Sequence, residues 1–208
     1  DFTRRKGWLV ILVFVVLYRY GDAVAGAMAN PFYVDLGFSG VEIASVTKVF
    51  GVLMVMAGVF VGGVLVARLG LIRALLVGGV LQAVTNLTFA WLATRGHDLG
   101  ALTAAVGIDS FAGGLGSAAF VAYLSALCNV AFTATQYALL TSLMAFGRTA
   151  LASASGFLAE WLGWPGFFIA TMLLAAPALI LLFWIARNDA TARAEKSAMA
   201  AGEGQPAA

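Results

Sequence analysis

Five ionisable residues stand inside long apolar stretches of this sequence, namely Arg19, Asp22, Lys48, Asp109 and Arg148. A charge at membrane depth is costly unless it faces a partner or a water-filled path. Side chains of this kind bind charged solutes or carry protons across a membrane. The sequence therefore predicts a polar working interior inside a membrane protein.

Arg19 and Asp22 form the most compact group. They lie three residues apart and share one face of a helix, so they can pair with each other or with charged groups of a substrate. A self-neutralising pair that only stabilises the helix is the alternative. We favour a polar cavity, because an ion pair between lipids would remain costly and because further polar groups lie near the same depth, namely Tyr18, Tyr20, Lys48 and Asp109.

Asp109 precedes a run of small residues at 110–117. It is a candidate proton-carrying carboxylate, because removal from water favours the neutral form of an acid. A role as the salt-bridge partner of Lys48, Arg19 or Arg148 stays open beside it. The glycines of this run, like Gly58 and Gly62 earlier in the chain, predict close packing of helices.

Three candidates lie further along the chain. Gln136 and Tyr137 belong to a polar stretch that can line a path or hold helices together by hydrogen bonds. Arg148 lies closer to the end of its apolar stretch. Binding of a carboxylate is one role for it, and snorkelling toward the membrane surface is the alternative.

The composition places these residues in a membrane. The chain has 62% apolar and 11% charged residues and a mean hydropathy of +0.96, against about 25% charged residues in globular domains. A span needs about 20 apolar residues, and six stretches within residues 8–186 meet this length: 8–30, 40–67, 72–93, 99–127, 131–161 and 166–185. We therefore expect an all-α integral membrane protein.

The segments at the two ends of the sequence are polar. We expect residues 1–7 to form a cytoplasmic lead-in and residues 187–208, which are rich in alanine and polar side chains, to form a disordered cytoplasmic tail. The first residue is Asp rather than Met, so we also expect this sequence to belong to a longer parent.

Several classes of function are disfavoured. A net charge of +2 without a basic stripe argues against a nucleic-acid partner. Cys128 is the only cysteine and His97 the only histidine, so no metal site and no cofactor is expected. An intramembrane enzyme needs a nucleophile beside a base, and no such pattern surrounds His97. We expect no catalytic residue.

Basic residues in the connections predict the orientation, because Arg and Lys collect on the cytoplasmic side. Eight of them fall on one side if both ends are cytoplasmic: Arg4, Arg5, Lys6, Arg68, Arg73, Arg187, Arg193 and Lys196. The opposite connections hold one basic residue, Arg95, together with Asp35, Glu42, His97, Asp98 and Glu160.

The charges also suggest an internal repeat. Spans one, two, four and five contain the five ionisable residues, whereas spans three and six contain none, so we expect two inverted triads with peripheral third members. Arg19 and Asp109 each lie about 15 Å into their helices by the 1.5 Å rise per residue. That depth is near the midplane, where secondary transporters bind substrate.

The connection at 63–73 resembles the loop motif of the major facilitator superfamily. Gly63, Arg68, Gly70 and Arg73 match the motif, but Ala67 stands where the family usually has an acid, which weakens a charge-relay gate. A tight turn with arginines on the cytoplasmic side explains these residues almost as well.

Residues 18–33, 98–123, 123–129 and 135–140 strongly resemble AmpG-type anhydromuropeptide permeases, a proton-driven branch of that superfamily. The resemblance covers residues 7–186 and looks like the C-terminal six-helix half. It implies import of anhydromuropeptides, which are sugar-peptides, across the bacterial inner membrane for peptidoglycan recycling. The implied partners are the lipid bilayer, protons, the substrate and the N-terminal six-helix half.

Three buried cations against two acids suit a ligand with peptide carboxylates, and Tyr18, Tyr20, Tyr123 and Tyr137 are candidates to stack on sugar rings. Two alternatives stay open. One is another carrier of the superfamily, such as an acetyl-coenzyme A transporter. The other is a six-helix subunit that works as a homodimer.

Overall fold

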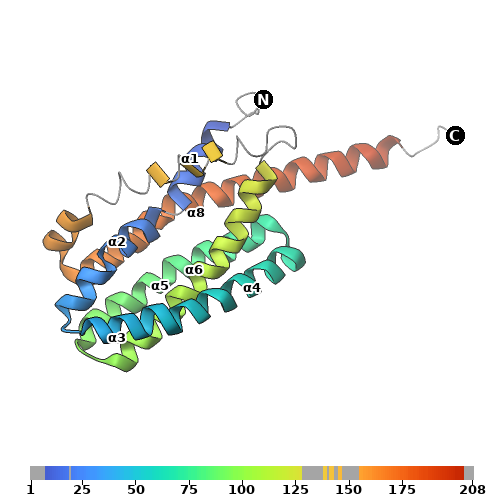
Figure 1. Cartoon of the computed structure of the whole chain (residues 1–208). Coiled ribbons are helices and arrows are strands. Elements are labelled where there is room, and N and C mark those ends of the chain that lie inside the picture. The colour runs from blue at the N-terminus through green and yellow to red at the C-terminus, as the bar shows by residue number, and fades with distance from the viewer. Residues whose placement is uncertain are drawn as a thin grey trace.

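The computed structural model describes residues 8–18, 20–127, 138–139, 141–142, 145–146 and 155–203. Figure 1 shows that this part of the chain is a bundle of long helices, without a strand, as the sequence predicts. The helices are α1 (Trp8–Tyr18), α2 (Tyr20–Asp35), α3 (Gly40–Ala44), the π-helix η2 (Ser45–Phe50), α4 (Gly51–Leu69), α5 (Leu71–Arg95), α6 (Leu99–Leu127) and α8 (Ser155–Glu203).

Four helical stretches in the described residues are long and apolar enough to cross a membrane: Gly40–Leu69, Leu71–Arg95, Leu99–Ala126 and Ser155–Trp184. The first three lie over the spans expected at 40–67, 72–93 and 99–127, and the fourth includes the span expected at 166–185. The spans expected at 8–30 and 131–161 include residues outside the described part, so the number of spans stays a prediction.

α8 contains a bend at Gly163, where φ is 65° and ψ is 167°. Such a φ is readily adopted by glycine, which has no Cβ. Residues 155–161 before the bend belong to the expected fifth span. After it, the helix continues to Glu203, whereas we expected a disordered tail from residue 187. Alanine, the strongest helix former, recurs in this stretch and favours its continuation as helix.

α4 and α5 are joined by a single residue, Gly70, whose φ of 82° requires glycine. Arg68 and Arg73 are exposed on either side of this turn. The tight turn that we considered as the alternative explanation of residues 63–73 is therefore present. It lies at the opposite end of α4 from the α2–α3 connection.

α6 packs against α4 at backbone contact. A Cβ added to Gly58 of α4 would collide with the carbonyl oxygen of Phe111, and one added to Gly114 of α6 would collide with the carbonyl oxygen of Val55. A Cβ at Gly62 would lie 2.7 Å from the carbonyl oxygen of Leu115. The close packing predicted for these glycines is confirmed.

α5 packs against α6 on one side and α8 on another. A Cβ at Gly78 would lie 2.9 Å from Cα of Gly116 in α6, and one at Gly79 would lie 2.8 Å from a methyl carbon of Leu179 in α8. These adjacent glycines let two helices approach α5, and the peripheral position expected of span three stays a prediction. Its remaining side is exposed and apolar, and includes Val77, Val80 and Val84.

A layer of polar side chains lies between two apolar clusters in the bundle. Phe32, Phe89 and Phe168 belong to the first cluster, and Leu75 to the second, in which the rings of Tyr18 and Phe120 stack 5.0 Å apart. Because α5 contributes to both clusters, its residues between positions 75 and 89 lie at the level between them. Buried polar side chains occupy this level: Gln82, Thr85 and Asn86 on α5 and Thr171 on α8.

The glycine contacts predict the stability of single variants. We expect Gly58→Ala and Gly114→Ala each to lower the midpoint of thermal unfolding, because overpacking costs about 1–3 kcal/mol and each new Cβ meets a backbone carbonyl. Gly63→Ala is the matched control, since Gly63 is exposed on the same helix as Gly58 and a Cβ there has no atom within 4 Å. Melting of the detergent-solubilised protein measures the effect; equal midpoints for all three variants would contradict the packing.

Candidate functional site

A cavity of about 350 Å³ lies where α2, the α3–η2 segment, α5 and α6 meet. Its polar lining residues come from three of these elements: Asn30 and Tyr33 from α2, Thr47 and Lys48 from η2, and Asp109 and Ser110 from α6. The structure thus brings Lys48 and Asp109, two of the predicted site residues, to one cavity. A cation, an acid and neutral hydrogen-bonding groups together suit a polar ligand.

Asp109 is half-buried on α6, and a side chain of α5 holds it. The hydroxyl oxygen Oγ1 of Thr85 lies 3.0 Å from Oδ1 of Asp109 and donates a hydrogen bond to it. Thr85 itself is only 1% exposed. The acid therefore has one side toward the cavity and one toward a dry contact between two helices.

Lys48 reaches the cavity from the π-helical turn η2. A π-helical turn inserts one extra residue and is frequent at functional sites. On the α6 side of this turn, Gly51 and Gly107 permit close approach: a Cβ at Gly107 would lie 2.5 Å from the ring of Phe50. The turn is thus held against α6, and Lys48 with it.

Asp22 lies on the face of α2 that continues toward the cavity. Asp22, Gly26, Ala29 and Tyr33 follow one another at spacings of four, three and four residues, so they share one face of the helix. The last three line the cavity, and Asp22 is partly buried about one turn away from them. This agrees with an acid that faces the interior of the bundle.

The other predicted site residues are placed differently. Tyr20 is partly buried and packs against the first apolar cluster. Gly63, Arg68, Gly70 and Arg73 surround the α4–α5 turn, away from the cavity. Outside the described residues lie Arg19, Gln136, Tyr137 and Arg148.

Two tyrosines that we considered for stacking on sugars are core residues instead. Tyr18 is 8% exposed and donates a hydrogen bond to the carbonyl oxygen of Leu75, and Tyr123 is 5% exposed and packs edge-on against Phe14. Their rings fill the second apolar cluster, so the expectation is wrong for both. Tyr33 takes a place at the cavity that the sequence did not assign to it.

We also did not predict the polar layer of α5 from the sequence. Gln82, Thr85 and Asn86 stand at the i, i+3 and i+4 spacing of one helix face inside an apolar span, which is a signal that sequence reasoning can use. The amide nitrogen of Asn86 is buried and has no hydrogen-bond partner among the described residues. Such a group is costly, and in native proteins it calls for a specific explanation.

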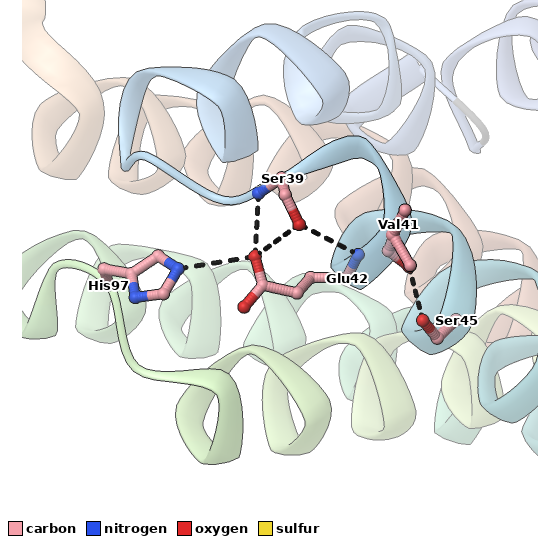
Figure 2. A network of polar contacts seen from close by, with 5 residues as sticks. All are labelled: Ser39, Val41, Glu42, Ser45 and His97. Atoms are coloured by element: carbon pink, nitrogen blue, oxygen red, sulfur yellow. Dashed lines mark hydrogen bonds and ion pairs between the residues drawn. The ribbon is translucent and has the colours of Figure 1, made fainter.

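One end of the bundle is tied by a polar network, which Figure 2 shows. Ser39 caps α3: its hydroxyl accepts from the backbone nitrogen of Glu42, while its own backbone nitrogen donates to Oε2 of Glu42 at 2.8 Å. Nε2 of His97, in the α5–α6 turn, lies 3.5 Å from the same oxygen. The network therefore links the α2–α3 connection to the α5–α6 turn.

The bend of α8 is fixed at this end as well. Nε1 of Trp164 donates to Oδ2 of Asp35 at 2.6 Å, which joins the residue after Gly163 to the last residue of α2. Asp98 caps α6 by accepting hydrogen bonds from the backbone nitrogens of Gly100 and Ala101. The cavity, whose lining includes Gly40 and Ile43 of α3, thus lies next to an end of the bundle that is held by several direct contacts.

The family model described as Major Facilitator Superfamily matches residues 11–207 of this chain. The chain belongs to the major facilitator superfamily. This superfamily consists of membrane transporters, and the chain accordingly is a multi-pass membrane transporter chain rather than an enzyme.

Individual relatives show which branch of the superfamily this chain resembles. "Putative transporter AmpG 4" of Rickettsia conorii is 38% identical over 185 residues, which cover 89% of this chain and 45% of the relative. The "Anhydromuropeptide permease" of Escherichia coli strain K12 is 40% identical over 182 residues, which cover 87% of this chain and 37% of the relative. The chain therefore spans less than half the length of these relatives, and the resemblance to AmpG-type permeases is confirmed.

Proposed function

We propose that this chain forms one six-helix half of a proton-coupled transporter that imports anhydromuropeptides across the bacterial inner membrane for peptidoglycan recycling. The observation that carries the proposal is the 40% identity to a protein named anhydromuropeptide permease over nearly the whole chain. The second half of the path comes from the N-terminal six helices, since the relatives are more than twice as long as the matched region.

In this proposal the six helices form two inverted triads, with both ends of the chain in the cytoplasm. The eight basic residues assigned to the cytoplasmic side support this orientation. Arg68 and Arg73 flank the α4–α5 turn, whereas Asp35, Glu42 and His97 belong to the other end of the bundle. The two groups of connections are thus separated as the orientation requires.

The substrate binds at the cavity in this proposal. Lys48 attracts the carboxylates of the peptide part, and Asn30, Tyr33, Thr47 and Ser110 offer hydrogen bonds to sugar hydroxyl and amide groups. Arg19 and Arg148 add positive charge from the same path. The N-terminal half supplies the opposite wall.

Asp109 carries the coupling proton in this proposal. It is an acid on the cavity wall that is half-buried and shares the cavity with Lys48. Protonation from the outer side removes its charge, and release of the proton on the inner side restores it. A carboxylate in a partly dry site can serve both states because burial weakens its preference for the ionised form.

The orientation predicts which positions react with an impermeant thiol reagent in intact cells. In a Cys128→Ser background we expect Asp35→Cys and His97→Cys to react from outside, and Arg68→Cys and Arg193→Cys to react only after the membrane is opened. The reverse pattern would show that the chain is inserted the other way round.

The coupling role predicts the behaviour of Asp109→Asn in the full-length transporter. Asparagine cannot take up or release the proton, so we expect accumulation of labelled anhydromuropeptide driven by a pH gradient to be lost, while exchange of substrate without a gradient remains. Uptake into proteoliposomes measures both activities.

Asp98→Asn is the matched control for this experiment. Asp98 caps the N-terminus of α6, the helix that carries Asp109. Asparagine caps helices as well as aspartate does. We expect normal accumulation from this variant. Accumulation that survives in Asp109→Asn would remove Asp109 from the coupling role.

A further inference from the structure

The hydroxyl of Thr85 has two oxygen atoms within hydrogen-bond distance. Its Oγ1 lies 3.0 Å from Oδ1 of Asp109 on α6 and 2.8 Å from the backbone carbonyl oxygen of Gln82 on its own helix. A threonine hydroxyl has a single hydrogen to donate and two lone pairs to accept with. At any moment it therefore donates to one of these two oxygens.

The charge of Asp109 decides which oxygen receives the hydrogen. Hydrogen bonds to an ionised acceptor are roughly twice as strong as neutral ones. With Asp109 ionised, Thr85 donates to the carboxylate. The carbonyl of Gln82 belongs to a helix, and it needs no second donor.

We propose that Thr85 is a positioning residue that keeps a hydrogen bond to Asp109 in both protonation states. When Oδ1 of Asp109 takes up a proton, the new O–H donates to Oγ1 of Thr85, and the hydrogen of Thr85 turns to the carbonyl of Gln82. One proton is gained by the carboxyl group and none is lost elsewhere, because the hydroxyl only rotates. This inference rests on the coupling role proposed for Asp109.

The surroundings of Thr85 favour such a two-way contact. Thr85 is 1% exposed and Gln82 is 8% exposed, so water is largely excluded on this side of the acid. A buried polar group that loses its partner costs roughly 1–3 kcal/mol. A threonine that can both donate and accept avoids this cost whether Asp109 is charged or neutral.

Other titratable groups face Asp109 from the neighbouring elements. Tyr33 of α2 and Lys48 of η2 line the same cavity, and they approach the acid from the open side. Thr85 comes from α5, on the closed side. Its contact therefore persists while groups in the cavity exchange with substrate.

The test is infrared difference spectroscopy of the full-length transporter between acidic and alkaline buffer. The carbonyl band of protonated Asp109 is assigned by its loss in Asp109→Asn. We expect this band to move to higher frequency in Thr85→Val, which keeps the shape but has no hydroxyl, and to stay in place in Thr85→Ser. If Thr85→Val does not fold, Thr85→Ala replaces it, and we expect the same move of the band to higher frequency.

Thr88→Val is the matched control, because Thr88 is on the same helix and donates to the backbone carbonyl of Thr85 rather than to a carboxylate. We expect its band to be unchanged. For uptake driven by a pH gradient, we expect Thr85→Val to be slower by about fivefold, the ratio that one net hydrogen bond produces. Thr85→Ser and Thr88→Val should keep the normal rate.

The possible failures are distinguishable. A band that stays in place in both Thr85→Val and Thr85→Ala would overturn the role of Thr85 and leave Asp109 as the coupling acid. If no band of the wild-type protein disappears in Asp109→Asn, Asp109 does not change protonation, and the coupling proposal fails together with this inference.

Discussion

The structure depends on the close approach of α6 to α4 on one side and to α5 on the other. Glycines at 58 and 62 of α4, 78 of α5 and 114 and 116 of α6 bring these backbones to contact distance. In a lipid environment the hydrophobic effect does not hold helices together, so close packing at small residues has to. The rotation of each helix is thereby fixed, and with it the side chains that face one another.

One consequence is the position of Asp109. Because α6 is held between two helices, the acid stands at the cavity with Lys48 and Tyr33 on one side and has Thr85 on the other. The apolar clusters around Phe32 and around Tyr18 lie beyond this level in either direction. The buried polar side chains Gln82, Thr85, Asn86 and Thr171 thus lie in one layer with Asp109, where charge is tolerated because partners are present.

The sequence predicts part of this arrangement. Lys48 and Asp109 could be found because a charge inside an apolar span is a strong signal, and the glycine spacing indicated close packing. The spacing of Gln82, Thr85 and Asn86 indicates a polar face on that helix, but it does not say which residue the face meets. Neither the contact of Thr85 with Asp109 nor the place of Tyr33 at the cavity could be assigned, because the rotation of each helix depends on distant glycines. Tyr18 and Tyr123 show the converse error: their rings suit a binding site by type, but packing places them in the core.

The central claim is that a direct contact between α5 and α6 positions Asp109. A double-mutant cycle on Thr85→Val and Asp109→Leu tests it most directly, with the free energy of unfolding measured by titration with a denaturing detergent. We expect the two effects to be non-additive, with a coupling of about 1 kcal/mol, the usual net value of one hydrogen bond. Additive effects of the two substitutions would contradict it.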